Sequence, residues 1–312
     1  MPQYADIPEP VVQHKGELLI SVKAAAIKHV DKSRASGKHY SAGKELTRAT
    51  VIGGDGVGVL KDGTRVYAIG GTGMAAEKAV IEKDRMVKLP KNIDDVTAAA
   101  LPNAVIGSAM GLRFRAGMKK GETVLINGAT GFTGKMAVQV AKLYGAKKVI
   151  VTGRNEQSLQ LLTALGADEI VSINQDDAAI VAQIKAIHSR TPVNIVIDYL
   201  WGHTAELILS AFKGNGLFTH RTRFVSIGSV TGDLIQLSAE NLRSVNLQLN
   251  GSGLGSWTRE EVRQLLRNIL PEMFKLAARN KVKVDTISVG LVDIEKLWEM
   301  EVPDGKRLVV TI

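Results

Sequence analysis

Cysteine is absent from this 312-residue chain. That absence excludes disulfide bonds, thiolate zinc sites, cysteine nucleophiles and iron–sulfur clusters. Aromatic residues make up only 4% of the chain, which leaves few side chains to stack on unpaired bases. No apolar run reaches the roughly 18 residues that a membrane span needs, and the first residues show no export pattern. We therefore expect a soluble, cytoplasmic protein with no membrane partner.

Positive charge is in excess but is not concentrated. The chain has 40 Lys and Arg against 31 Asp and Glu, a formal net charge of +9. Such an excess attracts anionic ligands. Because the basic residues are spread along the chain, the pattern favours a small anionic ligand over a nucleic acid. The length predicts two domains, at about 150 residues per domain.

The first 100 residues are typical of a mostly β region. Short apolar segments at 18–22, 57–59 and 65–68 are separated by glycine clusters such as Gly53-Gly54 and Gly70-Gly71. Glycine at these points favours tight turns between short strands.

The chain then changes to alternating strands and helices. Apolar runs expected to be strands lie at 123–127, 149–151, 169–171, 195–198, 224–227 and 247–249, with helical spacing between them. Strands that are apolar on both faces and separated by helices predict a parallel sheet covered on both sides. Right-handed crossovers make this a doubly wound fold.

The C-terminal part predicts one long helix and a last strand. The helix runs from about Arg259, behind the capping candidate Thr258, to Lys281, and Pro271 is expected to kink or interrupt it. The segment 307–312 reads as a strand that returns to the first β region. We therefore expect domains at 1–103 and 104–250, with 251–312 returning to the first domain.

The most informative segment is 127–134, Asn-Gly-Ala-Thr-Gly-Phe-Thr-Gly. It follows a predicted strand and opens a predicted helix, as a dinucleotide-binding loop does. Small residues let backbone N–H groups approach a diphosphate, and the helix N-terminus adds positive charge. Ala129 stands in place of the usual first glycine.

A second interpretation of this loop is the phosphate loop of a nucleoside triphosphatase, with Asp198 as the magnesium-binding acid. Ala129 again replaces the first glycine. Met136 stands where a Ser or Thr hydroxyl must bind magnesium, which a methionine does not do. The sequence therefore favours a dehydrogenase over a triphosphatase.

The end of the second strand of this region predicts the cofactor. An NAD enzyme places an acid about 20 residues after the glycine loop to bind the ribose 2′-OH. Here the residues are Gly153, Arg154 and Asn155. Arg154 can bind a 2′-phosphate, and Gly153 leaves space for it. The expected cofactor is NADPH.

With these residues identified, the chain resembles the zinc-independent quinone oxidoreductases of the medium-chain dehydrogenase/reductase superfamily over nearly its whole length. The stretches that carry the resemblance are 30–37, 53–58, 62–67, 117–146, 165–168 and 305–309.

The resemblance implies an α/β fold in which a Rossmann doubly wound parallel sheet is joined to a GroES-like, mostly β catalytic domain built from both chain ends. It also implies NADPH and a homodimer formed by extending the Rossmann sheets. By the same resemblance, Thr130, Gly131, Phe132 and Thr133 lie at the diphosphate, and Gly153, Arg154 and Asn155 face the adenosine phosphate. Tyr199 and Leu200 border the adenine ribose, and Ile227, Gly228, Ser229, Leu254 and Gly255 approach the nicotinamide.

The chain departs from this family at several positions. The opening β-hairpin is largely missing. An Asn beside the substrate corresponds to Lys28, a Tyr shortly after it corresponds to Ser33, and a Thr beside the nicotinamide falls at Gly107. These departures leave the substrate less defined than the cofactor.

The expected reaction is metal-free hydride transfer from NADPH to a quinone or an α,β-unsaturated carbonyl. No Cys is present, and the six histidines include no His-x-x-x-His pair, so no metal site is expected. Quinones and enones accept hydride because charge spreads onto a conjugated oxygen. Lys28, His39 and Tyr40 are the candidates to stabilise that oxyanion. Besides the triphosphatase, a non-catalytic protein that binds NADPH or RNA stays open as an alternative.

Overall fold

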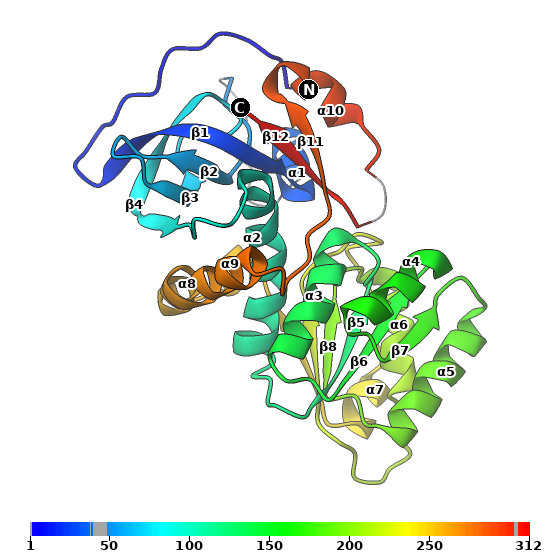
Figure 1. Cartoon of the computed structure of the whole chain (residues 1–312). Coiled ribbons are helices and arrows are strands. Elements are labelled where there is room, and N and C mark those ends of the chain that lie inside the picture. Colours follow the sequence, from blue (N-terminus) through cyan, green and yellow to red (C-terminus); the bar gives the residue numbers. More distant parts are fainter. Residues whose placement is uncertain (1, 38, 40–48, 303–304) are drawn as a thin grey trace. The chain divides into compact units, whose positions relative to one another are not determined.

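The computed structural model describes residues 2–37, 39, 49–302 and 305–312. The chain forms two compact units (Figure 1). The terminal unit comprises Met1–Pro102 and Arg263–Ile312, and the central unit comprises Asn103–Val262. The segment 251–262, expected to return to the first domain, therefore lies in the central unit. One reason is an ion pair between Glu261 and Arg115, both central-unit residues.

The central unit is built on a parallel sheet of six described strands in the order β7-β6-β5-β8-β9-β10. The chain starts at β5, winds outward to β7, and then returns to β8 on the other side of β5. The boundary between β5 and β8 is therefore the switch point at which such sheets bind ligands. The strands are β5 (Thr123–Asn127), β6 (Lys148–Gly153), β7 (Glu169–Ser172), β8 (Ile195–Asp198), β9 (Thr222–Ser226) and β10 (Leu247–Gly251).

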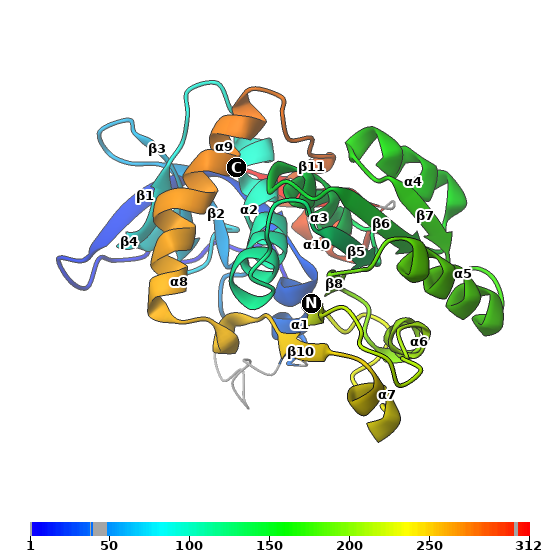
Figure 2. The ribbon, with the colours of Figure 1, turned by 90° about the horizontal axis from the view of Figure 1, so that it is seen from below.

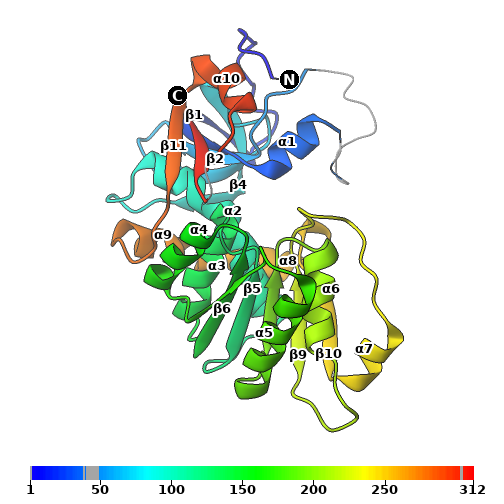
Figure 3. The same ribbon diagram turned by 90° about the vertical axis from the view of Figure 1, so that its right-hand side faces the viewer.

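Burial explains why these strands form. Every residue of β5 and of β8 is buried, as expected for strands covered on both faces. Figure 3 shows helices on both sides of the sheet. α5 packs on α6 and buries Ile180, Ile184 and Ile187, the residues whose spacing predicted that helix. The helices are α3 (Phe132–Leu143), α4 (Glu156–Leu161), α5 (Asp177–Arg190), α6 (Gly202–Ala211) and α7 (Ala239–Ser244).

The terminal unit is a mostly antiparallel sheet in the order β11-β12-β1-β2-β3-β4, and β1 also pairs with β4. Figure 2 shows β1 to β4 grouped together. The last strand pairs with β1 in antiparallel register, with Ala25 opposite Val310, so its predicted return to the first β region is confirmed. The strands are β1 (Glu17–Ile27), β2 (Asp55–Val59), β3 (Arg65–Gly70), β4 (Lys78–Lys88), β11 (Thr286–Gly290) and β12 (Arg307–Thr311); the helices are α1 (His29–Ala35), α9 (Leu270–Ala278) and α10 (Ile294–Glu299). These two sheets confirm the expected combination of a Rossmann fold with a GroES-like fold.

The helix expected over 259–281 is interrupted as predicted. It consists of α8 (Arg259–Gln264), a π-helical turn at Leu265–Ile269, and α9. Pro271 lies in the first turn of α9, where its missing N–H costs least. Thr258 caps the start, because its hydroxyl accepts from the Glu261 amide at 3.2 Å and Glu261 Oε2 accepts from the Thr258 amide at 2.8 Å.

The chain passes from the terminal unit into the central unit inside α2 (Asp95–Met110). α2 is followed directly by a π-helical turn at Gly111–Arg115. None of the helices in the described ranges combines the length and apolar character that crossing a bilayer requires.

Candidate functional site

The turn after β5 is held by side chains from three neighbouring strands. The Asn127 amide donates to Asp198 Oδ1 on β8 at 2.8 Å and accepts from Thr152 Oγ1 on β6 at 2.6 Å. The Gly128 N–H donates to the same Thr152 hydroxyl at 3.2 Å. Gly128 has a φ of 83°, and a Cβ there would lie 2.8 Å from Leu200 Cγ, so glycine is required. These contacts fix where the loop begins.

The N-terminus of α3 carries no side chain at its capping position. Gly131 is its N-cap, with φ −72° and ψ 164°, and a Cβ on Gly131 would meet no atom within 4 Å. By contrast, a Cβ on Gly134 would lie 2.4 Å from the Gly128 carbonyl oxygen and 2.5 Å from Ala129 Cα. The helix therefore rests directly on the turn, and space is open at its positive end. This arrangement fits the diphosphate of a dinucleotide.

The end of β6 presents a cation beside this loop. A Cβ on Gly153 would lie 2.6 Å from Thr130 Cγ2, so the absence of a side chain at 153 lets the loop lie against β6. Arg154 is exposed, and no described residue forms a hydrogen bond or ion pair with it. Asn155 is the N-cap of α4, because its Oδ1 accepts from the Ser158 amide at 2.9 Å. Arg154 is therefore available to an anion.

Asp198 organises the turn after β8. It is fully buried and accepts from Asn127, from the Leu200 amide at 3.0 Å and from the Trp201 amide at 3.1 Å. Burial raises the pKa of Asp198, and these hydrogen bonds oppose the rise. Trp201 has a φ of 57°, a strained conformation for a residue other than glycine, and the strain lies at the switch point. Sequence reasoning treated Asp198 only as a rival magnesium ligand and missed this positioning role.

The remaining predicted cofactor residues also lie in the central unit. The backbone N–H groups of Ile227 and Gly228 both donate to the Asp198 carbonyl, at 2.8 and 3.3 Å. A Cβ on Gly228 would lie 2.7 Å from the Tyr199 carbonyl oxygen, so the ends of β8 and β9 are in close contact. Leu254 and Gly255 lie in a 3₁₀ turn after β10, where Leu254 is 57% exposed.

Lys28, a predicted catalytic residue, is buried in the terminal unit just before α1. Its side chain is 5% exposed. The ammonium donates to the Ala26 carbonyl at 2.9 Å and to Asp55, and it lies 3.0 Å from Asp31 Oδ2. An ammonium group has three N–H bonds, and these three acceptors match them. Lys28 is therefore engaged by protein groups and has no spare N–H for an oxyanion in this arrangement.

Lys28, Asp31, Asp55, Tyr67 and Arg307 form what we call the Lys28 cluster. The Tyr67 hydroxyl donates to Asp55 Oδ2 at 2.6 Å. Burial acts to lower the pKa of Lys28, but Asp55 and Asp31 together outweigh it, and the pKa is raised. Burial also lowers the pKa of Arg307, to about 10, although Asp55 and Asp31 act to raise it. The two positive charges of this cluster, on Lys28 and Arg307, are thus matched by the two negative charges of Asp31 and Asp55.

Of the other two predicted catalytic residues, His39 and Tyr40, only His39 lies among the residues that the structure describes. His39 is partly exposed just after α1, and its backbone N–H donates to the Ser33 carbonyl at 3.2 Å. Burial, and to a smaller extent Arg34, lowers the pKa of His39, so its ring is neutral at pH 7. Tyr40 lies outside the described residues.

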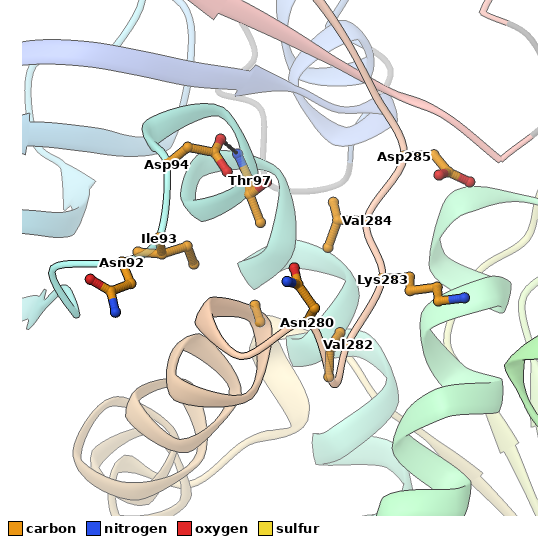
Figure 4. Close-up of a pocket in the computed structure, with 10 residues that line it drawn as sticks. Asn92, Ile93, Asp94, Thr97, Asn280, Val282, Lys283, Val284 and Asp285 are labelled. Atoms are coloured by element: carbon orange, nitrogen blue, oxygen red, sulfur yellow. Dashed lines mark hydrogen bonds between the residues drawn. The ribbon is translucent and has the colours of Figure 1, made fainter.

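One cavity of about 450 Å³ lies in the terminal unit (Figure 4). Its walls come from the segment at the start of α2 and from the segment between α9 and β11. Asp94 accepts from the Thr97 amide at 2.8 Å and so caps α2. The cavity contains none of the residues predicted to bind cofactor or to react. The residues around it are Asn92, Ile93, Asp94, Thr97, Ala277, Asn280, Val282, Lys283, Val284 and Asp285.

The triphosphatase interpretation of the loop finds no support in this geometry. Met136 stands where the magnesium-binding hydroxyl would be, and it is 1% exposed on the face of α3 that packs against the core. The Asp198 carboxylate is taken up by Asn127 and two backbone amides.

Known proteins match this chain over most of its length. Residues 133–270 match the family model described as zinc-binding dehydrogenase. A "Probable NADPH-dependent quinone reductase" of Emericella nidulans is 28% identical, over 99% of this chain and 96% of the relative. A chloroplastic NADPH-dependent alkenal/one oxidoreductase of Arabidopsis thaliana is 34% identical, over 52% of this chain and 46% of the relative. The crystal structure of Escherichia coli quinone oxidoreductase complexed with NADPH has a TM-score of 0.78 at 23% identity, and the match covers 99% of this chain and 95% of that one.

The name of the matched family model includes zinc binding. The sequence offers no cysteine. Among the described residues, the group of side chains close enough to share a metal is His14, Glu17 and Glu82, which are exposed or half-buried just before β1, at the start of β1 and in β4. The matched family model covers less than half of this chain, whereas the Emericella nidulans relative spans nearly all of it, and together these matches show that the chain is similar to quinone oxidoreductases.

Proposed function

We propose that this protein is an NADPH-dependent oxidoreductase that transfers hydride to a quinone or an α,β-unsaturated carbonyl. The observation that carries the proposal is the open start of α3 at Gly131, with the exposed guanidinium of Arg154 at the end of β6. The first accommodates a diphosphate and the second a 2′-phosphate. The names of the Emericella nidulans and Arabidopsis thaliana relatives include the same cofactor.

The proposed reaction requires that the protein orient the acceptor and stabilise the negative charge that develops on it. NADPH, when bound, supplies the hydride, and the acceptor gains that hydride and one proton to become a hydroquinone or a saturated carbonyl. Negative charge develops on the conjugated oxygen of the acceptor. The protein must align the acceptor, keep water away and provide a donor to that oxygen.

We assign these tasks without a metal, because the chain has no cysteine and the group of His14, Glu17 and Glu82 includes none of the residues predicted to bind cofactor or to react. Of the three predicted oxyanion donors, Lys28 is engaged with Asp31 and Asp55 and so acts by holding the start of α1. His39, with a partly exposed neutral ring, is the proposed N–H donor. Tyr40, the homodimer and the cytoplasmic location stay predictions.

Turnover with a panel of acceptors tests this function. We expect oxidation of NADPH in the presence of quinones and enones, with much slower oxidation of NADH and little reduction of simple aldehydes. Exhaustive treatment with EDTA should leave the rate unchanged. If EDTA abolished the rate and zinc restored it, the metal-free assignment would be wrong, and a protein that oxidised NADPH with none of these acceptors would contradict the proposed reaction.

Substitutions at two glycines of the loop distinguish an effect on stability from an effect on cofactor binding. Gly134→Ala is expected to lower the free energy of unfolding by about 1–3 kcal/mol, because its Cβ would meet backbone atoms of Gly128 and Ala129. Gly131→Ala should change stability by less than about 0.5 kcal/mol, since no atom lies near its Cβ.

The Gly131→Ala methyl group occupies the space proposed for the diphosphate, so it should weaken NADPH about tenfold or more through lost charged hydrogen bonds. Urea unfolding and fluorescence titration measure the two effects. Unchanged NADPH affinity in Gly131→Ala would show that the diphosphate binds elsewhere.

A further inference from the structure

The hydroxyl of Tyr199 is buried without a hydrogen-bond partner among the described residues. Tyr199 follows β8 directly and is 8% exposed. Tyr67, the other deeply buried tyrosine of the described chain, donates its hydroxyl to Asp55 at 2.6 Å. Native proteins pair nearly all buried hydroxyls, because an unpaired one destabilises the fold. The Tyr199 hydroxyl therefore requires an explanation that Tyr67 does not.

The ring of Tyr199 lies in the central unit at the switch point. Its backbone N–H donates to the Asn127 carbonyl on β5 at 3.2 Å. Its Cε1 is 3.8 Å from the position that a Cβ on Gly107 would occupy. That same position is 3.5 Å from Thr133 Cγ2 and from Ile227 Cγ2. The phenol thus lies near the first turn of α3 and the end of β9, beside a residue that has no side chain.

The order of the strands indicates which half of a dinucleotide this phenol faces. Arg154, the proposed partner of the 2′-phosphate, ends β6, and the diphosphate loop follows β5. β8 lies on the opposite side of β5 from β6. Strands are about 4.8 Å apart, so the ends of β6 and β8 are separated by roughly 10 Å across the edge. A dinucleotide with its adenosine at β6 and its diphosphate at β5 extends its other half toward β8 and Tyr199.

We propose that the Tyr199 hydroxyl forms a hydrogen bond with the nicotinamide half of bound NADPH. This placement differs from the expectation that Tyr199 borders the adenine ribose. This inference rests on the proposed function. Ribose hydroxyls and the carboxamide of that half offer the acceptors and donors that the phenol lacks in the protein alone. Burial raises the pKa of Tyr199, which keeps the phenol neutral and able to donate.

The test is Tyr199→Phe, which removes one oxygen atom and keeps the ring. We expect the affinity for NADPH, measured by fluorescence titration, to fall about tenfold. The affinity for adenosine 2′,5′-bisphosphate, which lacks the nicotinamide half, should stay unchanged. The melting temperature of the free protein should not fall, because the hydroxyl has no partner to lose. Tyr67→Phe is the matched control, and its melting temperature should fall because the bond to Asp55 is lost.

The outcomes separate this inference from the function on which it rests. If the parent protein does not bind NADPH, the proposed function fails. If the parent binds NADPH and Tyr199→Phe binds it equally well, the function stands and the role of Tyr199 is overturned. An equal loss for adenosine 2′,5′-bisphosphate would overturn the placement at the nicotinamide half. A fall in melting temperature like that of Tyr67→Phe would assign the hydroxyl to a bond within the protein.

Discussion

Replacing Arg154 with alanine is expected to weaken NADPH binding about 10- to 100-fold and to leave NADH binding unchanged. Hydrogen bonds to charged groups contribute about 1.5–3 kcal/mol, and about 1.4 kcal/mol corresponds to a factor of ten. Arg154 is exposed at the end of β6 and forms no hydrogen bond or ion pair with a described residue, so its removal should not disturb the fold. The preference for NADPH over NADH should therefore largely disappear.

Titration of both nicotinamides against parent and variant measures this effect. Arg154→Lys should keep part of the preference, because an ammonium group supplies the charge but not the planar pair of donors. Arg243→Ala is a matched control, because Arg243 is an exposed arginine on α7 of the same unit and is not one of the predicted site residues. If Arg154→Ala discriminated between the two nicotinamides as well as the parent does, another residue would have to bind the 2′-phosphate.

The sequence was most informative where the fold depends on local patterns. Runs such as 123–127 and 195–198 are apolar throughout, because both faces of a parallel strand are buried, and these strands form as predicted. The strand β4 was not predicted, because its second half, with Glu82, Lys83, Asp84 and Arg85, shows charge rather than alternation. β4 forms because β1 pairs with it and closes the small sheet, which is a long-range pairing.

The same distinction holds for the candidate site. The loop at 127–134 is contiguous in sequence, so its glycines and its position before α3 were visible. The Lys28 cluster joins residues 27 positions apart, Lys28 and Asp55, through the register of β1 and β2, and no local pattern predicts it. The Tyr199 hydroxyl is informative only because it has no partner, and that is a property of the folded chain. Functional residues that act through contacts between distant segments therefore need the structure.

Replacing Lys28 with methionine is expected to lower the free energy of unfolding by about 3–5 kcal/mol at pH 7. Removing one partner of a buried ion pair leaves an uncompensated buried charge, and the expected loss is of that size. The two carboxylates are not affected equally. Asp31 keeps hydrogen bonds from the Lys28 and Gly54 amides, at 2.9 and 3.2 Å, whereas Asp55 keeps the Tyr67 hydroxyl. Asp55 should therefore account for most of the loss.

The dependence of this stability loss on pH follows from the direction in which the pKa of Lys28 is shifted. The pKa of Lys28 is raised in the folded parent, so its contribution to stability is complete at neutral pH and is lost only as the pH rises through that raised value. Lys28→Met has no ammonium group to titrate, so it lacks the stability that the charged Lys28 gives the parent at neutral pH. The destabilisation of the variant relative to the parent is therefore full at neutral pH and shrinks as the pH rises through the raised pKa of Lys28.

Urea unfolding of parent and Lys28→Met between pH 7 and about pH 11 measures this dependence. The difference in free energy of unfolding should narrow as the pH rises. Adding Asp55→Asn to Lys28→Met should recover stability at pH 7, because the unpaired carboxylate is removed and an amide can still accept from Tyr67. A constant difference across this pH range, or no recovery in the double variant, would show that the loss comes from packing of the lysine chain and not from charge. In that case Lys28 would hold the start of α1 through its hydrocarbon stem.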